Sequence, residues 1–358
     1  MKYAIVGCGR ISELHIKAAL ECGLEFVGLC DLVRDKAIQR RAMLSADTSV
    51  GVYTDYKKML DETAPELVAV TTDSGAHAEI ALECISRGIN VIIEKPIALS
   101  VAQARKIAEE ADKKDVCVCA CHQNRFNKSV CVIREAIENG KFGKLLHASA
   151  NIRWHRGKDY YEQDKWRGTW ASDGGTLMNQ CIHNIDLLRW LMGNDIDEVF
   201  AYTDRMNHDY IEAEDFGAAL VKFSNGSYGI IEGTSNIYPE DFEETLSVFG
   251  KYGRVRAGGQ SVNTIEEWAL ADESVHPDDI KKAAHENPPN VYGFGHMALY
   301  RDVCAAIREH RKPYITAWDG MRAVELVLGI YKSAALGRPV KFPLDDCSTL
   351  DFVGRFDK

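Results

Sequence analysis

The stretch Lys2-Tyr3-Ala4-Ile5-Val6-Gly7-Cys8-Gly9-Arg10-Ile11-Ser12 opens the chain and decides the fold of its first part. Lys2–Val6 is a mostly apolar run of strand length, and the apolar residues after the glycines recur at helical spacing. A strand that turns through Gly7 and Gly9 into a helix is a dinucleotide-binding fingerprint, although Ser12 stands where a third glycine is usual. Gly7 permits the tight turn, and Gly9 lets a pyrophosphate approach the helix N-terminus. A glycine turn that binds no ligand is the alternative.

An acidic residue, Asp31, follows the next predicted strand, Phe26–Cys30. A carboxylate at this point can accept hydrogen bonds from both ribose hydroxyls and would repel a 2′-phosphate, which favours NAD over NADP. Arg34 lies three residues further on and slightly weakens this preference. The alternative is that Asp31 only caps the following helix. We expect NAD as the cofactor.

Strand and helix patterns continue to alternate through the first third of the chain. Leu67–Thr71, Val91–Glu94 and Val116–His122 have the composition of buried strands, and His77–Arg87 has that of a helix. Repeated β-α-β units of this length predict a parallel, doubly wound sheet. We therefore expect an N-terminal α/β domain of the Rossmann type over residues 1–123, with NAD as its ligand.

The pattern changes after residue 123. Several strand-like runs are joined by short turns, and Asn225-Gly226 is a hairpin signal. Strands joined in this way predict an open, mainly antiparallel sheet. One long helix is expected from about Thr176 to Met192. Residues 124–358 are therefore predicted to form an α+β C-terminal domain.

Composition and charge exclude several classes of protein. The net charge of −10 over 358 residues argues against nucleic acid as the main partner, because phosphate neutralisation needs a basic surface. No apolar run reaches the ~18 residues of a membrane helix, and the N-terminus has no signal-peptide core, so we expect a cytoplasmic protein. The 11 cysteines are scattered and lack the paired spacing of zinc sites, so we expect reduced thiols and no metal site.

A lysine, Lys95, follows the predicted strand Val91–Glu94 and precedes Pro96. Ligands bind at the carboxyl ends of strands in open α/β sheets. The amine of Lys95 can hydrogen-bond a reacting hydroxyl and favour its alkoxide. A lysine at a strand end is more often only a solvated charge, but the preceding fingerprint favours a functional residue here.

A second group of candidate residues follows the double glycine Gly174-Gly175, which we expect to let a ligand approach the backbone. Asn179 and His183 are four residues apart in the predicted helix, so their side chains are expected on one face. His183 is the natural proton acceptor, and Asp186 could orient its imidazole. A lone histidine on a helix is usually structural. We predict that Lys95, His183 and Asn179 are the catalytic residues.

Arginines and aromatic residues are concentrated between residues 153 and 170. They are Arg153, Trp154, His155, Arg156, Tyr160, Tyr161, Trp166, Arg167 and Trp170. Arginine forks bind carboxylate or phosphate, and aromatic faces suit sugar rings. A packed loop or an oligomer contact is the alternative for each of these residues.

These motifs together resemble the family of glucose–fructose oxidoreductase and inositol dehydrogenase over nearly the whole chain. The resemblance rests on the glycine turn, on residues 72–77, on Glu94-Lys95-Pro96, and on Gly174-Gly175 leading to His183. It implies a nicotinamide cofactor, action of Lys95 and His183 on a substrate hydroxyl, and dimers or tetramers through the open sheet. The cofactor residues predicted from the motifs and the resemblance are Gly7, Cys8, Gly9, Arg10, Ile11, Asp31, Thr72, Ser74, His77, Glu94, Lys95, Gln123, Trp166 and Arg167.

Two features distinguish this chain within the family that it resembles: the residue at position 179 and the run that leads to His183. Many members carry aspartate where this chain has Asn179, so Asn179→Asp is expected to be tolerated or to alter the pH profile. The run from Tyr160 to His183 is similar to dehydrogenases that oxidise the 3-hydroxyl of UDP-N-acetylglucosaminuronic acid. That substrate has a carboxylate, which we expect Arg153 to bind with Tyr161 nearby, or alternatively Arg156.

The predicted substrate residues are therefore Arg153, Tyr161, Asn179 and His183. Two other functions remain open. One is a dehydrogenase of a free polyol or sugar such as inositol, and the other is a nucleotide-sensing regulator that has the fold without turnover.

Overall fold

The computed structural model describes residues 1–44, 49–272, 275–288 and 292–357, and within them the chain forms two compact units. The first unit comprises Met1–Ala98, Ala102–His122 and His296–Met321. The second comprises Leu99–Val101, Gln123–Gly295 and Arg322–Lys358. A segment from late in the chain therefore belongs to the first unit.

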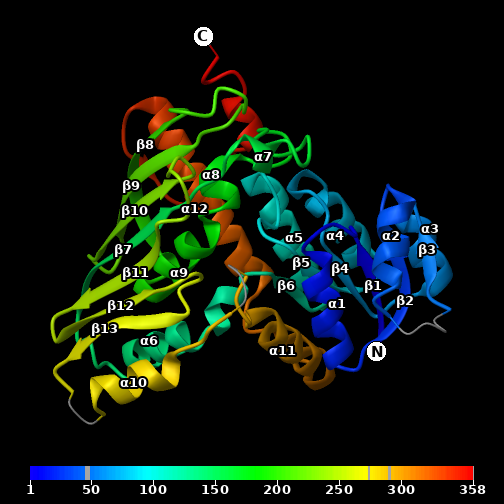
Figure 1. Cartoon of the computed structure of the whole chain (residues 1–358), viewed down its shortest axis with the longest axis horizontal. Coiled ribbons are helices and arrows are strands. Elements are labelled where there is room, and N and C mark those ends of the chain that lie inside the picture. Colours follow the sequence, from blue (N-terminus) through cyan, green and yellow to red (C-terminus); the bar gives the residue numbers. More distant parts are fainter. Residues whose placement is uncertain (45–48, 273–274, 289–291, 358) are drawn as a thin grey trace. The chain divides into compact units, whose positions relative to one another are not determined.

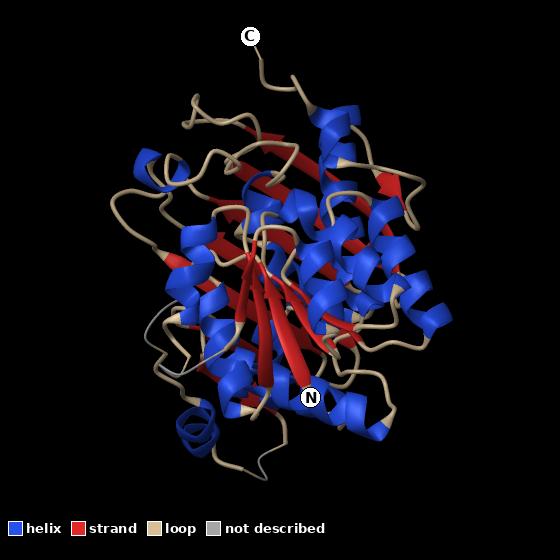
Figure 2. Ribbon diagram, turned by 90° about the vertical axis from the view of Figure 1, so that its right-hand side faces the viewer, coloured by secondary structure: helices blue, strands red, loops and turns tan. Residues whose placement is uncertain are grey.

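The first unit is built on a six-stranded parallel sheet in the order β3-β2-β1-β4-β5-β6, with helices beside it on both faces (Figure 2). Its strands are β1 (Lys2–Val6), β2 (Glu25–Cys30), β3 (Gly51–Tyr53), β4 (Leu67–Val70), β5 (Asn90–Ile93) and β6 (Val118–Ala120). Strands β1, β4 and β5 lie in the middle of the sheet, and nearly all their side chains are buried. The predicted doubly wound α/β fold is confirmed.

Helices of the first unit connect these strands. They are α1 (Ser12–Glu21), α2 (Arg34–Arg41), α3 (Tyr56–Thr63), η1 (Ser74–Ala76), α4 (His77–Ser86) and α5 (Val101–Lys114). Asp55 begins α3, because its carboxylate accepts a hydrogen bond from the Lys57 backbone N–H at 2.8 Å. Helix α11 (Gly295–Glu309) contributes residues from 296 onward, and its Tyr300 is fully buried.

The second unit is built on an eight-stranded sheet in the order β13-β12-β11-β7-β10-β9-β8-β14. Its strands are β7 (Leu145–Arg153), β8 (Ile196–Asp204), β9 (Phe216–Phe223), β10 (Tyr228–Thr234), β11 (Glu243–Gly250), β12 (Gly253–Gly258), β13 (Thr264–Leu270) and β14 (Val340–Lys341). Neighbouring strands are antiparallel except for β7 and β10, which pair in parallel. The prediction of an open, mainly antiparallel sheet is confirmed.

Helices cover one face of this sheet (Figure 1). Those of the second unit are η2 (Gln123–Phe126), α6 (Lys128–Glu138), α7 (Lys158–Tyr161), α8 (Gly175–Asn179), α9 (Ile182–Met192), α10 (Pro277–Ala284), η3 (Thr349–Phe352) and most of α12 (Ala317–Leu336). Helices α8 and α9 contact β10 so closely that a Cβ at Gly233 would lie 2.6 Å from the sulfur of Cys181. The opposite face shows exposed Tyr202, Leu220 and Tyr228, because successive side chains of a strand alternate between faces.

The single helix predicted over residues 176–192 is wrong. The Thr176 carbonyl accepts hydrogen bonds from the backbone N–H groups of both Gln180 and Cys181, at 2.8 and 3.0 Å. This widened turn ends α8 at Asn179, and α9 begins anew at Ile182. Asn179 and His183 therefore lie in two successive helices rather than in one, so the four-residue spacing of a regular α-helix does not apply between them.

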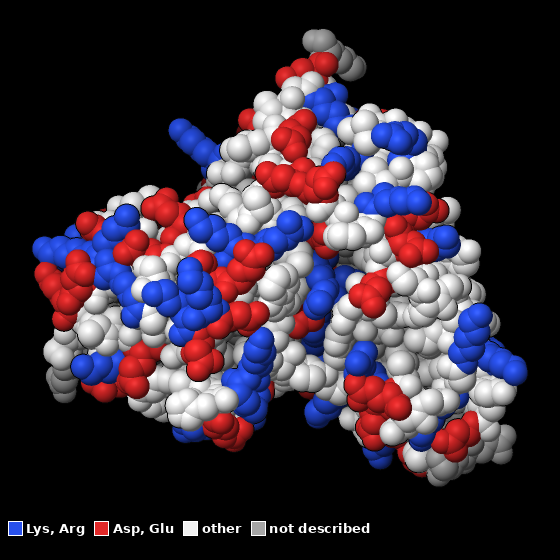
Figure 3. All heavy atoms as spheres, turned by 180° about the vertical axis from the view of Figure 1, so that it is seen from behind, with Lys and Arg blue, Asp and Glu red and all other residues white. Residues whose placement is uncertain are grey.

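None of the helices in the described part of the chain is long and apolar enough to cross a bilayer. On the face of the molecule shown in Figure 3, acidic and basic side chains are interspersed. This face therefore has no continuous basic patch of the kind that nucleic acid requires.

Candidate active site

The glycine turn after β1 needs both of its glycines, for different reasons. Gly7 has φ +97°, and a Cβ there would lie 2.5 Å from the backbone of Thr71 and Thr72. The Thr71 hydroxyl also donates to the Gly7 carbonyl at 2.5 Å. A Cβ at Gly9 would meet nothing within 4 Å. Gly7 is therefore required by packing, whereas Gly9 leaves the turn open to a ligand.

Ser12 stands where the fingerprint usually has a third glycine, and its hydroxyl hydrogen-bonds the turn. It donates to the Gly9 carbonyl at 2.6 Å. Arg40, on α2, also donates to that carbonyl at 3.0 Å and to the Ser12 hydroxyl at 3.0 Å. Arg40 could not be predicted from the fingerprint, because it lies 31 residues from Gly9.

The carboxylate of Asp31 lies at the end of β2, beside the glycine turn. One oxygen accepts from the Cys8 backbone N–H and the other from the Val33 N–H, both at 2.8 Å. The N-cap residue of α2 is Val33, so Asp31 does not occupy that position. The other residues predicted around the turn, Arg10 and Ile11, lie between Gly9 and α1.

The loop after β4 and the turn after β5 are joined by His77. Its Nδ1 lies 2.7 Å from the Pro96 carbonyl oxygen, and its Nε2 lies 3.2 Å from that of Thr72. Burial lowers the pKa of His77, against the opposing effect of these carbonyls. His77 thus fixes loop backbone, while Ser74 is buried in η1.

Lys95 follows β5, and its peptide bond to Pro96 is cis. Its backbone N–H donates to Glu94 Oε2 at 3.1 Å. The other Glu94 oxygen lies 2.8 Å from His15 Nε2 and 3.6 Å from His296 Nε2. Glu94, one of the predicted cofactor residues, is therefore held in a buried network next to Lys95 in the chain.

This network continues through two tyrosines. His15 Nδ1 lies 2.7 Å from the Tyr300 hydroxyl, which lies 2.6 Å from that of Tyr3. Burial lowers the pKa of His15. Burial alone would raise the pKa of Glu94, but hydrogen bonds from His15 and His296 outweigh it and hold that pKa well below its usual range. Glu94 is thus ionised, and neutral His15 donates to it.

The same network contains side chains that could bind a metal ion. Among the described residues, the ligand atoms of His15, Glu94, Cys121 and His296 lie within 4.8 Å of one another. Both nitrogens of His15 already have hydrogen-bond partners in Glu94 and Tyr300. These hydrogen bonds account for both ring nitrogens of His15, and the absence of a metal site stays a prediction.

In the second unit, the double glycine before α8 accommodates a side chain of the chain itself. Gly174 and Gly175 have φ +85° and +89°, and a Cβ at Gly175 would lie 1.7 Å from Glu214 Oε2. Glu214 Oε1 accepts from the Leu177 backbone N–H at 2.7 Å. The expectation that both glycines make room for a ligand is therefore wrong for Gly175, because the buried Glu214 fills that space.

The carboxylate of Asp186, which is predicted to orient His183, is bound by two arginines. Its two oxygens accept from Nε and Nη2 of Arg125, each at 2.7 Å, and one also accepts from Arg189 at 2.8 Å. All three side chains are buried. The arginine of η2 thus anchors α9, the helix that carries His183, and the 61-residue separation hid this pairing from the sequence.

Arg153 lies on the opposite face of the sheet from α8 and α9. On β7 the side chains of Ala148, Ala150 and Ile152 are buried, and Arg153 belongs to the alternate set. Its guanidinium pairs with Glu232 and with Glu243, each at 2.5 Å. The structure therefore gives Arg153 two carboxylates of its own chain in place of the expected substrate carboxylate.

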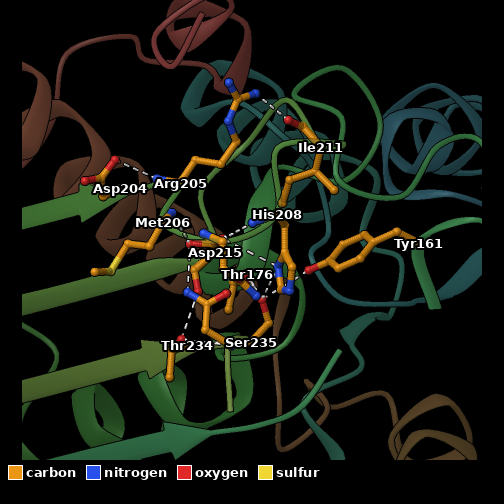
Figure 4. A network of polar contacts seen from close by, with 12 residues as sticks. Tyr161, Thr176, Asp204, Arg205, Met206, His208, Ile211, Asp215, Thr234 and Ser235 are labelled. Carbon is orange, nitrogen blue, oxygen red and sulfur yellow. Dashed lines mark hydrogen bonds and ion pairs between the residues drawn. The ribbon is translucent and has the colours of Figure 1, made fainter. Parts of the chain in front are cut away.

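Tyr161 takes part in a polar network that closes the end of β10 (Figure 4). Its hydroxyl lies 3.2 Å from Ser235 Oγ, which lies 3.0 Å from Thr176 Oγ1. Ser235 Oγ is also 3.5 Å from His208 Nδ1. The Asp215 carboxylate accepts from the His208 backbone N–H at 2.8 Å and holds the loop in place. Tyr161 is thus hydrogen-bonded within a buried network at the end of β10.

Two other arginines surround Tyr160, close to the end of α8. The guanidinium carbons of Arg156 and Arg167 lie 5.6 and 4.3 Å from the Tyr160 ring centre. The Tyr160 hydroxyl accepts from Arg167 at 2.5 Å and from the Gln180 amide at 3.0 Å. Arg167 also stacks on Trp166. Gln180 directly follows Asn179, so this cationic cluster borders a predicted catalytic residue.

Two known family domains match the chain, one mainly over each of its two units. One family domain, described as "Oxidoreductase family, NAD-binding Rossmann fold", matches residues 1–122. A second, "Oxidoreductase family, C-terminal alpha/beta domain", matches residues 134–342. The chain belongs to the GFO/IDH/MocA oxidoreductase family. The predicted family, the NAD cofactor and the oxidoreductase activity are confirmed.

Individual members of this family resemble the chain over nearly its full length. The WlbA dehydrogenase of Bordetella pertussis, solved with NADH and UDP-GlcNAcA, is 34% identical, with a TM-score of 0.90 over 96% of this chain and 98% of that one. The WlbA dehydrogenase of Chromobacterium violaceum, solved with the same two ligands, is 32% identical, with a TM-score of 0.88 over 96% of each chain. Myo-inositol 2-dehydrogenase of Thermotoga maritima is 25% identical over 95% of this chain and 98% of that protein.

The residues of the first unit fit the family's cofactor. The turn at Gly9 is open, and the Asp31 carboxylate is fixed by two backbone N–H groups at the end of β2. This is where a dinucleotide places its pyrophosphate and adenine ribose. Gln123 lies in η2 of the second unit, where its carbonyl oxygen would lie 2.1 Å from a Cβ at Gly295.

Asp31→Ala is expected to relax the preference for NAD over NADP. A 2′-phosphate beside a carboxylate is a like-charge contact that costs on the order of a few kcal/mol, so the ratio of the two dissociation constants should change by about tenfold or more. Calorimetric titration of each cofactor measures this ratio. Asp35→Ala, which removes an exposed acid of α2, is the control. Equal or tighter binding of NADPH by the unmutated protein would overturn the assignment of Asp31.

Glu214 is buried as a neutral acid. Burial raises its pKa well above the usual range. The Tyr331 hydroxyl contacts both the Gly174 carbonyl and Glu214 Oε1, the latter at 2.8 Å. A hydroxyl has one proton, so both contacts are satisfied together only when Glu214 carries a proton of its own.

Glu214→Gln is therefore expected to stabilise the protein increasingly as the pH rises. A raised carboxyl pKa contributes stability below the unfolded pKa, about 4.3, and that stability is lost as the pH rises toward the folded pKa. The wild type should lose up to about 1.4 kcal/mol per pH unit in this range, and the glutamine variant should lack that part of the slope. Urea unfolding from about pH 5 to about pH 8, with exposed Glu240→Gln as the control, measures the difference. Parallel curves for wild type and variant would mean that Glu214 is ionised.

Proposed function

We propose that the protein oxidises the 3-hydroxyl of a UDP-linked N-acetylhexosaminuronate, UDP-N-acetylglucosaminuronate in the first instance, with NAD. The observation that carries this proposal is the similarity over 96% of the chain to two WlbA dehydrogenases, at 34% and 32% identity, whose structures contain NADH and UDP-GlcNAcA. The cationic cluster of the second unit supports it, because such a substrate is an anion.

The proposed chemistry is a hydride transfer with loss of a proton. NAD supplies the acceptor for the hydride that leaves the sugar carbon. The amine of Lys95 stabilises the developing alkoxide, and His183 takes the hydroxyl proton. Asn179 is proposed to hydrogen-bond the same substrate. The products are a ketone, NADH and one proton.

The substrate carboxylate is proposed to bind at Arg156 and Arg167. Among the described residues, Arg156 pairs with one carboxylate, that of Asp241, at 2.8 Å, and the side chain of this aspartate is 38% exposed. A partly exposed ion pair contributes only about 0–1 kcal/mol, so a substrate carboxylate can compete for the guanidinium. Arg153, in contrast, is held by two glutamates on the far face of the sheet. We therefore propose Arg156, the alternate residue of the sequence analysis, in place of Arg153.

A free polyol is the second candidate substrate. Myo-inositol 2-dehydrogenase of Thermotoga maritima, at 25% identity over 357 residues, supports it. A polyol carries no charge and would make no use of the arginines around Tyr160.

A substrate screen distinguishes the two candidates. UDP-GlcNAcA, UDP-GlcNAc and myo-inositol are each incubated with NAD, and the absorbance of NADH is followed. We expect reduction with UDP-GlcNAcA. Reduction with myo-inositol and none with either UDP-sugar would replace the proposed substrate by a polyol.

We also propose that the protein is a homodimer or homotetramer that buries the uncovered face of the eight-stranded sheet. Leu220 and Tyr228 on that face are 56% and 52% exposed, and Tyr202 is 66% exposed. Aromatic and aliphatic side chains of this kind are typical of interface cores. Light scattering should give a particle of two or four chains, and Leu220→Arg should shift it toward one. A monomeric wild type would overturn this proposal.

A further inference from the structure

Asn179 is held by a buried carboxylate that the sequence did not single out. Its side-chain amide nitrogen donates to Asp173 Oδ1. The other oxygen of Asp173 accepts from the Gly168 backbone N–H at 2.6 Å, and Asp173 is only 1% exposed. An ionised carboxylate has no proton to donate, so the amide must turn its nitrogen toward Asp173 and its oxygen away from it.

We propose that Asp173 is a positioning residue that orients the Asn179 amide for the substrate. This inference rests on the proposed function, in which Asn179 contacts the substrate. The family resemblance places an aspartate at position 179 in many members. In this chain position 179 has an amide, and the negative charge is on Asp173, six residues earlier. The pair Asp173 and Asn179 thus takes the place of a single aspartate.

Asp173 also connects Asn179 to the arginine-bearing loop. The backbone N–H groups of Asp173 and Gly174 both donate to the Thr169 carbonyl, at 3.1 and 2.9 Å. Together with the bond from Gly168, these contacts fold residues 168–174 into a compact turn directly after Arg167. One carboxylate therefore fixes both the amide of Asn179 and the end of the loop that carries Arg167.

Two outcomes are expected for Asn179→Asp, tolerance or an altered pH profile, and this arrangement favours the altered pH profile. The substitution would place a second carboxylate against the buried Asp173. Two carboxylates that share a site cannot both ionise easily, so the pKa of one of them rises. When that carboxyl is protonated it can donate to its neighbour as the amide does. The activity of Asn179→Asp, relative to wild type at the same pH, should therefore recover as the pH falls.

The test exchanges the two groups. Asp173→Asn, Asn179→Asp and the double exchange are compared for kcat and KM with UDP-GlcNAcA and NAD. Each single variant should lose about 10–150-fold in kcat, the range of a charge-assisted hydrogen bond, with KM for NAD unchanged. The double exchange restores one amide and one carboxylate and should recover most of the loss. Asp159→Asn, at an exposed acid of α7, is the control.

A double exchange no more active than the poorer single variant would overturn the proposal, and so would an Asn179→Asp variant that matches wild type at every pH. Urea unfolding of the wild type, the two single variants and the double exchange tests the Asp173–Asn179 pair independently of the substrate. If UDP-GlcNAcA is not oxidised by wild type, the proposed function fails, but the pair should still show non-additive stabilities. Additive stabilities would show that Asp173 and Asn179 do not act together.

Discussion

Lys95→Ala and His183→Ala are each expected to lower turnover by about 10²–10⁴-fold, the usual contribution of a positioned acid or base. Neither substitution removes a group of the glycine turn or Asp31. Lys95 is also among the predicted cofactor residues, but we expect the turn and Asp31 to contribute most of the binding, so NAD should still bind to both variants. The losses should appear in kcat, because both residues are proposed to act on the hydroxyl as its proton leaves. Steady-state kinetics and calorimetric titration of NAD measure the two quantities separately.

The matched control for this prediction is His285→Ala, which removes an exposed histidine of the second unit. It should leave both kcat and NAD affinity unchanged. Nearly full turnover in His183→Ala would show that the proton acceptor has been assigned to the wrong residue. A large loss of NAD affinity in Lys95→Ala would show that Lys95 serves the cofactor rather than the hydroxyl.

Arg156→Met is expected to weaken UDP-GlcNAcA binding by about 10–150-fold, because a charge-assisted hydrogen bond contributes roughly 1.5–3 kcal/mol. Binding of UDP-GlcNAc, which lacks the carboxylate, should change little, and so should binding of NAD. Methionine retains an unbranched apolar side chain that can still pack on Trp154, whose ring centre lies 4.5 Å from the Arg156 guanidinium carbon. Calorimetric titration of each UDP-sugar with the NADH-loaded protein gives the comparison.

Arg153→Met is the control for Arg156→Met. Arg153 pairs with Glu232 and Glu243 on the uncovered face of the sheet, so its loss should lower stability without changing the preference between the two UDP-sugars. The assignment of Arg156 fails if its substitution weakens both UDP-sugars equally. It also fails if Arg153→Met alone removes the preference for the uronate.

The parallel sheet could be predicted because its signals are local. Apolar runs such as β1 and β4, separated by helical patterns, coincide with the observed strands. The three-residue strand β3 was missed, since so short a segment carries no periodicity. That residues 296–321 belong to the first unit was also not predicted, because an amphipathic helix does not encode which element it packs against.

The types of residue in the candidate site could be predicted from the sequence, but their hydrogen-bond and ion-pair partners could not. Asp31 and Lys95 lie at strand ends, where the strand pattern places them. Arg125, one partner of Asp186, and both glutamate partners of Arg153 lie 61 to 90 residues away, and only the fold brings them together. Gly175 was correctly predicted to be a point of close approach, but the approaching group is Glu214 rather than a ligand. Sequence spacing cannot distinguish these two causes.

The position of oxidation gives the most direct test of the proposed reaction. UDP-GlcNAcA that carries deuterium at C3 is incubated with the protein and NAD, and the reduced cofactor is examined by mass spectrometry. The proposal predicts that the deuterium is recovered in the reduced cofactor and that the sugar gains a ketone at C3. Reduced cofactor without deuterium, or reduction by myo-inositol with none by the labelled UDP-sugar, would contradict it.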